Sequence, residues 1–133
     1  MDKRRYIRWS KLALIGVGLS IGLSFAGCDR DDHRAIRAIT GGEPERGRVL
    51  IRTLGCATCH IVPGVRDVEG LVGPPLERIA SRAYLAGRIE NTPENMLRWI
   101  RFPKSVDPET VMPQIEMTEQ DGRDITAYLY TLR

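Results

Sequence analysis

Five consecutive residues, Cys56-Ala57-Thr58-Cys59-His60, constrain this chain more than any other part of its sequence. The order Cys-x-x-Cys-His is the attachment signature of haem c. Two thiols three positions apart can each add to one of the two vinyl groups of a single porphyrin. The histidine that follows then lies under the ring, with an imidazole nitrogen within reach of the iron. The motif therefore predicts one covalently held haem c, with His60 as its proximal ligand.

Three other arrangements use closely spaced cysteines. A redox-active dithiol belongs to a thioredoxin-like βαβ frame, whereas this sequence has no strand pattern. A zinc site needs four ligands, and the only other candidates, Cys28 and His33, precede the predicted domain. A disulfide between Cys56 and Cys59 would constrain the fold very little. Covalent haem is the favoured interpretation, and the zinc site and the dithiol are its alternatives.

Residues 1–27 have the pattern of an export signal. Five basic side chains accompany an uncharged, mostly apolar run from Leu12 to Gly27, which is short for a bilayer-spanning helix. Ala26, Gly27 and Cys28 are similar to a bacterial lipobox, in which the cysteine is acylated and becomes the mature N-terminus. We therefore expect a protein anchored by a lipid on Cys28 at the outer face of the cytoplasmic membrane. A soluble periplasmic protein and an uncleaved N-terminal anchor are the alternatives.

The positive charge of the chain belongs to this signal. The whole chain has 20 Lys and Arg and 17 Asp and Glu, a net charge of +3. Residues 1–27 hold 5 of these basic residues and 1 acidic residue, so residues 28–133 hold 15 and 16, a net charge of −1. This balance leaves no excess of basic residues for binding nucleic acid, and a nucleic-acid partner is excluded.

The rest of the sequence predicts a tether, residues 28–42, followed by one all-α domain, residues 43–133. The tether is charged at first and ends in two glycines, with helical character expected in residues 34–39. Prolines and glycines in residues 61–75, and prolines in residues 103–117, predict loops. No alternating strand pattern and no internal repeat is present in the sequence.

Start and stop signals place the helices of this domain. Pro44 suits the first turn of a helix that runs toward the haem motif. Residues 76–82 form a short helix candidate. Thr92, followed by proline and an acid, begins a helix that must stop by Pro103. Thr118 and the acid three residues later resemble a capping box for the last helix. The buried face of that helix is predicted to carry Ile125, Tyr128, Leu129 and Leu132.

This order of motifs resembles that of a class I cytochrome c. The matching parts are a helix leading into Cys-x-x-Cys-His, the segment Gly73-Pro74-Pro75-Leu76, a tryptophan-bearing helix, a Met-Pro loop and a C-terminal helix. The resemblance covers residues 43–133 and implies three main helices and a short one around one covalent haem. The stretch from Asn91 to Pro113 is especially similar to cytochrome c domains fused to, or acting with, bacterial haem–copper oxidases.

The resemblance also implies the residue that binds the iron opposite His60. Met112 lies at the ligand position of the family, and Met117 is the runner-up. Met96 lies at core spacing on a helix and is expected to fill the core. His33 lies on the wrong side of the first helix. A histidine and a thioether together leave no open coordination position, which favours electron transfer over catalysis.

Further residues match family positions around the haem. The carbonyl of Pro74 matches the acceptor of the proximal imidazole N–H. Arg82 and Thr110 match residues near the two propionates. Trp99 matches an aromatic side chain that faces the ligand methionine, with an ordinary core aromatic as the alternative. Gly47 and Tyr128 match the family positions at which the first and last helices cross.

These features predict a non-enzymatic monohaem electron carrier of a bacterial respiratory chain, which passes single electrons between membrane complexes. One alternative is a fixed electron-entry subunit of a terminal oxidase complex. The other is a haem enzyme or gas sensor with an open sixth coordination position. Lys104 is the single lysine after the signal. An apolar or weakly charged transient contact with a partner is therefore expected in place of a ring of lysines.

Overall fold

The computed structural model of the protein describes residues 28–65, 70 and 72–133. The expected export signal, residues 1–27, lies outside the described residues. The chain divides into two compact units, Met1–Asp32 and His33–Arg133, and the second unit carries the haem motif. Among the described residues, no helix is both long enough and apolar enough to cross a membrane.

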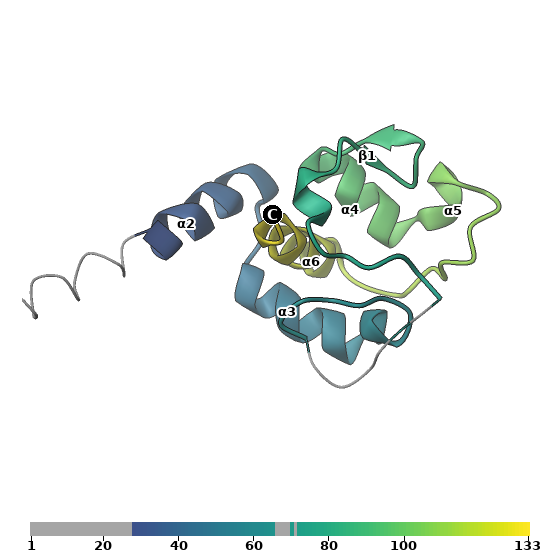
Figure 1. Ribbon diagram of the computed structural model, residues 1–133, viewed down its shortest axis with the longest axis horizontal. Coiled ribbons are helices and arrows are strands. Elements are labelled where there is room, and N and C mark those ends of the chain that lie inside the picture. Colours follow the sequence, from purple (N-terminus) through teal and green to yellow (C-terminus); the bar gives the residue numbers. More distant parts are fainter. Residues whose placement is uncertain (1–27, 66–69, 71) are drawn as a thin grey trace, which may run out of the picture. The chain divides into compact units, whose positions relative to one another are not determined.

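Helices dominate the second unit, as Figure 1 shows. Its three main helices are α3 (Pro44–Thr53), α4 (Pro93–Arg101) and α6 (Glu119–Thr131). The shorter elements are α5 (Pro103–Val106), the 3₁₀ turns η1 (Cys56–Thr58) and η2 (Ile79–Ser81), and the strands β1 (Tyr84–Leu85) and β2 (Ile89–Glu90). Helix α2 (Cys28–Thr40) begins in the first unit and ends in the second. The predicted all-α class and its three main helices are confirmed.

Two of the predicted helix starts are present with their capping hydrogen bonds. The Thr92 hydroxyl accepts the backbone N–H of Asn95 at 3.2 Å, and Pro93 occupies the first helical turn of α4. At α6, the backbone N–H of Asp121 donates to the Thr118 hydroxyl, while the backbone N–H of Thr118 donates to the Asp121 carboxylate. These bonds satisfy backbone donors that have no partner inside the helix.

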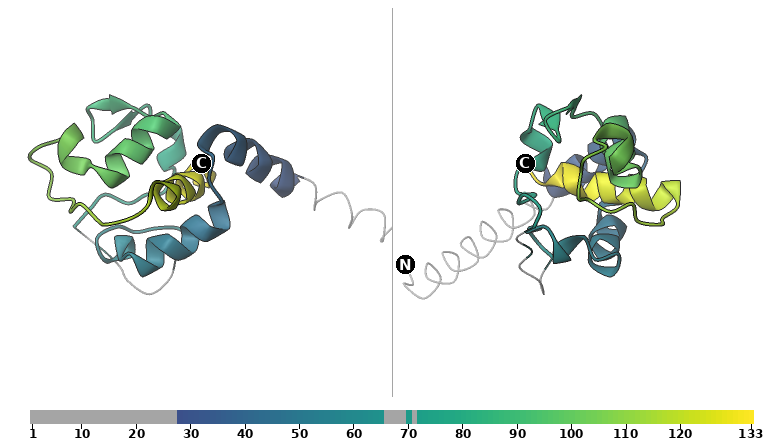
Figure 2. Two further views of the ribbon diagram at one scale, coloured as in Figure 1. Left: turned by 180° about the vertical axis from the view of Figure 1, so that it is seen from behind. Right: turned by 90° about the vertical axis from the view of Figure 1, so that its right-hand side faces the viewer.

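The core of the second unit forms where α3 and α6 cross, and Figure 2 shows these helices lying against each other in both views. Gly47 lies so close to the α6 backbone that a Cβ atom there would be 1.9 Å from the carbonyl oxygen of Asp124. Large apolar side chains on both sides of the crossing are almost fully buried, among them Ile51, Ile125, Tyr128 and Leu129. Met96 is 1% exposed in the same cluster, so its predicted role as core filler is confirmed.

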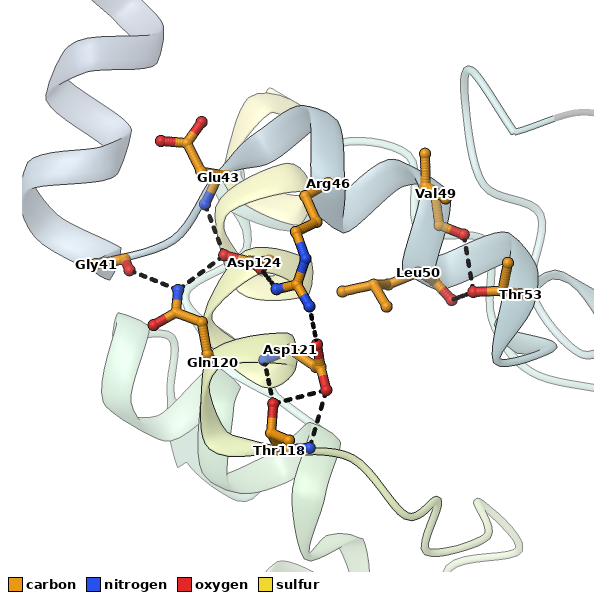
Figure 3. Close-up of polar contacts among 10 residues, drawn as sticks. All are labelled: Gly41, Glu43, Arg46, Val49, Leu50, Thr53, Thr118, Gln120, Asp121 and Asp124. Carbon is orange, nitrogen blue, oxygen red and sulfur yellow. Dashed lines mark hydrogen bonds and ion pairs between the residues drawn. The ribbon is translucent and has the colours of Figure 1, made fainter.

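A buried carboxylate joins the two crossing helices. Asp124 is 1% exposed and accepts hydrogen bonds from the backbone N–H of Glu43 at 2.8 Å and the side chain of Gln120 at 2.9 Å. Arg46 forms an ion pair with Asp124 and a second one with Asp121, as Figure 3 shows. The charge of Asp124 is therefore paired and hydrogen-bonded, as a buried carboxylate requires.

The structure differs from the sequence interpretation in residues 28–42. A helix covers residues 28–40, where only residues 34–39 were expected to be helical within an extended tether. Ile36 and Thr40 are each 2% exposed, and the carbonyl oxygen of Gly41 accepts a 3.0 Å hydrogen bond from Gln120 of α6. The end of this segment thus packs on the domain. Its two isoleucines among charged residues are too few to give a clear helical stripe.

A short helix and a two-stranded hairpin were also missed. Residues 103–117 were expected to be loop, but Pro103 opens the four-residue helix α5, because proline fits the first turn of a helix. Strands β1 and β2 pair antiparallel around Ala86 and Gly87, which both have positive φ, 51° and 65°, as a tight hairpin turn requires. Strands of two residues are too short to show an alternation of apolar and polar side chains in the sequence. The expected short helix over residues 76–82 is reduced to η2.

Candidate haem site

The two cysteines of the motif lie on one tight turn that follows α3. Gly55, with φ of +75°, lets the chain leave the helix. The backbone N–H groups of Cys59 and His60 then both donate to the carbonyl oxygen of Cys56, at 3.2 and 3.1 Å. Cys56 and Cys59 are partly buried free thiols, and burial raises the pKa of the Cys56 thiol. Two neighbouring thiols are thus available on one turn.

The imidazole of His60 is held by a backbone carbonyl. Its Nδ1 atom lies 2.8 Å from the carbonyl oxygen of Pro74, the contact that the family resemblance implies. When Nδ1–H donates this bond, Nε2 carries the free lone pair that binds a metal. Such a hydrogen bond fixes the tautomer and the ring orientation of a metal-binding histidine. His60 is therefore prepared to bind iron through Nε2.

Two glycines of the loop lie directly beside the haem motif. A Cβ atom on Gly73 would lie 2.3 to 2.8 Å from three atoms of the His60 ring. A Cβ atom on Gly70 would lie 2.3 Å from the backbone carbon of Cys59. The N–H of Gly73 also donates to the carbonyl oxygen of Cys59 at 2.8 Å. The loop can thus lie directly on the motif because both positions lack a side chain.

Arg82 reaches back to the same loop. Its guanidinium group donates to the carbonyl oxygen of Pro75, and more weakly to that of Glu77 at 3.4 Å. The first of these acceptors directly follows the residue that accepts the His60 hydrogen bond. Arg82 was predicted to lie near a propionate. In the structure its guanidinium group restrains the Pro74–Pro75 segment through this hydrogen bond.

The residues expected on the other side of the haem lie on α4 and on the loop between α5 and α6. Met112 and Thr110 are both partly buried, and the N–H of Met112 donates to the Thr110 hydroxyl at 3.2 Å. Trp99 and Met117 are partly buried and pack against the core cluster. The structure thus joins Thr110 to Met112 through a local turn, while Trp99 packs against the core cluster.

The residues expected farther from the haem lie at the N-terminal end of the described chain. Cys28 is the first residue of α2, and His33 is a partly buried residue of the same helix. Within residues 28–65, 70 and 72–133, there is no group of three or more His, Cys, Asp or Glu side chains that could hold a metal ion. Two thiols on one turn and an imidazole with its Nδ1 already engaged fit covalent haem c. When bound, this group supplies an iron that exchanges one electron.

The fold and the site together define a small helical domain in which two neighbouring thiols and a hydrogen-bonded histidine would hold haem c. Residues 44–133 match the family model described as cytochrome c. The chain therefore belongs to the cytochrome c family, whose domains bind haem c covalently and transfer electrons.

Curated relatives and solved structures are similar to this chain. It is 35% identical over 89 residues to cytochrome c oxidase subunit 2 of Alkalihalophilus pseudofirmus, a match that covers 66% of the chain and 25% of the relative. It is 32% identical over 82 residues to cytochrome c oxidase subunit 2 of Bacillus sp. strain PS3, covering 59% and 23%. The chain thus spans about a quarter of the length of these relatives.

One solved structure that is similar to this chain is cytochrome c2 from Rhodobacter sphaeroides, which superposes with a TM-score of 0.50 at 21% identity. The match covers 68% of this chain and 96% of that protein. At this level of identity the likeness shows the fold alone, and it confirms the predicted class I cytochrome c fold.

Proposed function

We propose that this protein is a single-electron carrier of a bacterial respiratory chain, with His60 and Met112 as the axial ligands of its haem iron. The observation that supports this most directly is the 2.8 Å hydrogen bond between His60 Nδ1 and the Pro74 carbonyl. An imidazole held in this way keeps its orientation when the charge on the iron changes. A site that moves little on oxidation suits electron transfer.

The thioether ligand is tested by replacing each candidate methionine by alanine in the haem-loaded protein. We expect a low-spin spectrum with a sulfur-to-iron charge-transfer band that Met112→Ala abolishes and Met117→Ala retains. The opposite pattern would assign the ligand to Met117. Binding of carbon monoxide or cyanide to the wild-type protein at low concentration would instead support the enzyme or sensor alternative, because both ligands need an open coordination position.

The partner that we propose is a haem–copper oxidase. Both curated relatives are named cytochrome c oxidase subunit 2, and this supports a role near such a complex. The protein would either shuttle between complexes or remain attached to the oxidase as its electron-entry subunit. Purification of the oxidase in mild detergent distinguishes the two roles, because a shuttle washes away and a fixed subunit stays bound.

The location that we propose is the outer face of the bacterial cytoplasmic membrane, where a lipid on Cys28 would hold the protein. This rests on the charged and apolar pattern of residues 1–27 and on the small residues before Cys28. The intact mass of the mature protein tests it directly. A chain that begins at Cys28 and carries acyl groups supports the proposal, and a mature chain without acyl groups refutes it.

A further inference from the structure

Asn91, the residue before the N-cap of α4, uses every polar atom of its side chain. The amide nitrogen donates to the carbonyl oxygens of Ile79 and Arg82, each at 2.8 Å. The hydroxyl of Tyr130 lies 3.2 Å from the amide oxygen of Asn91 and 3.2 Å from its backbone oxygen. All four contacts are partly buried. A carboxamide offers two N–H donors and one acceptor oxygen, so no other short side chain could replace this set of bonds.

These bonds fasten the segment that contains η2 at both ends. Ile79 is the first residue of η2, and Arg82 is the residue that follows it. The backbone N–H of Asn91 adds a 3.0 Å hydrogen bond to the carbonyl oxygen of Ala83. The N–H of Ala80 donates to the carbonyl oxygen of Leu132 at 3.1 Å. Two sets of hydrogen bonds thus hold this segment to the end of α6. One passes through Asn91 to Tyr130, and the other joins Ala80 to Leu132.

Arg82 connects this fastening to the proximal ligand. Asn91 holds the backbone of Arg82, and the Arg82 guanidinium donates to the carbonyl oxygen of Pro75. The preceding carbonyl, that of Pro74, accepts the hydrogen bond from His60. A continuous series of hydrogen bonds therefore runs from Tyr130 through Asn91 and Arg82 to the loop that orients the His60 ring.

We propose that Asn91 is a positioning residue for His60, an inference that rests on the proposed role of His60 as an iron ligand. By fixing Arg82, Asn91 keeps the Pro74 carbonyl in place to accept the Nδ1–H of the imidazole. That hydrogen bond raises the basicity of the ligand and so favours the ferric state. Loss of Asn91 weakens the bond and raises the midpoint potential of the haem.

The experiment compares Asn91→Ala with a matched control, Asn95→Ala, in the haem-loaded protein. Asn95 lies four residues away, and its side chain donates an exposed 3.0 Å hydrogen bond to the carbonyl oxygen of Glu90. The readouts are the midpoint potential and the hydrogen exchange of two backbone amides. That of Leu76 donates to the carbonyl oxygen of Ile61 at 2.9 Å, and that of Ala80 to the carbonyl oxygen of Leu132 at 3.1 Å. For Asn91→Ala we expect about a threefold change in the one-electron equilibrium constant, about 28 mV upward at 59 mV per tenfold. We also expect faster exchange at both amides, and neither effect in the control.

Each other outcome has a definite meaning. An unchanged or lowered potential in Asn91→Ala overturns the proposal, as does an equal rise in Asn95→Ala. Where Asn91→Ala fails to fold, Tyr130→Phe decides, because it removes only the hydroxyl: a smaller rise supports the proposal and no rise overturns it. A wild-type spectrum without the sulfur-to-iron charge-transfer band would refute a methionine ligand in the proposed function. The test of Asn91 would still apply, because it depends on His60 alone. A spectrum without histidine ligation would refute both.

Discussion

Gly47 permits the closest approach of α3 and α6, and its replacement by alanine tests whether this contact determines the stability of the fold. A Cβ atom at this position would lie 1.9 Å from the carbonyl oxygen of Asp124 and 2.5 Å from its carbonyl carbon. Contacts of a real Cβ atom almost never fall below 3.0 Å, so the helices must separate by about 1.1 Å. The obstacle is backbone, and no side chain can rotate to relieve it.

The cost of this separation follows from the packing at the crossing. A gap of up to about 1 Å forfeits roughly a quarter to a half of the dispersion energy across it. Ile51 and Ile125 are 1% and 2% exposed in this cluster, so the full overpacking penalty of about 3 kcal/mol applies. Alanine recovers about 1 kcal/mol of helix propensity over glycine. We therefore expect a loss of about 2 kcal/mol in the free energy of unfolding, or about 8 to 16 °C in Tm.

The assay is denaturant and thermal unfolding of the haem-loaded protein, followed by far-ultraviolet circular dichroism. Gly122→Ala is the matched control, because Gly122 lies within α6 and the three atoms nearest to a Cβ atom there belong to the side chains of Leu97 and Arg101. These side chains can move, so the control is expected to be nearly neutral. Equal stabilities for the two variants, or a loss below about 0.5 kcal/mol for Gly47→Ala, would show that the crossing is not tightly constrained.

Three further substitutions have definite expected results. Gly73→Ala should displace the His60 ring and lower the yield of haem-loaded protein, measured as the ratio of Soret to protein absorbance; an unchanged yield contradicts the close contact. Tyr128→Phe removes the 2.5 Å hydrogen bond to the Pro63 carbonyl and should cost about 1–3 kcal/mol of unfolding free energy, whereas a neutral result would mean that water replaces the hydroxyl. The N-cap hydroxyl of α6 and then the N-cap backbone N–H, as the largest causes, hold the pKa of Asp121 below its ordinary value. Its stabilising effect is therefore complete above about pH 3.9 and is lost as the pH falls through the lower folded pKa. Asp121→Asn should make unfolding less pH-dependent in that acid range, and an unchanged pH profile refutes the assignment.

Local signals in the sequence were sufficient for the features that depend on neighbouring residues. The caps at Thr92 and Thr118 were predictable because each hydroxyl bonds to a backbone N–H only three residues away. The apolar spacing of α6 correctly placed Ile125, Tyr128 and Leu129 in the core. The motif from Cys56 to His60 is likewise local.

The features that were missed depend on partners distant in the sequence. Asp124 would be expected on a surface, yet it is 1% exposed, because donors around Glu43 and Arg46 approach it from some 80 residues away. Gly70 and Gly73 indicated a loop, but nothing in the sequence showed that a side chain at either position would clash with Cys59 or His60. Asn91 looked like an ordinary residue before a helix cap. Nothing in its immediate neighbours indicates that Tyr130 and Arg82 will meet it.

The crossing of α3 and α6 also has a consequence for the order of folding. Its hydrogen bonds join residues 78 and 81 positions apart, so the core closes only when nearly the whole domain is present. Closing so long a loop costs chain entropy before any packing is gained, and such contacts form slowly. The turn from Cys56 to His60 directly follows α3, and it therefore stays outside a finished core until the last helix arrives. The topology therefore leaves an interval during folding in which the thiols of Cys56 and Cys59 are accessible.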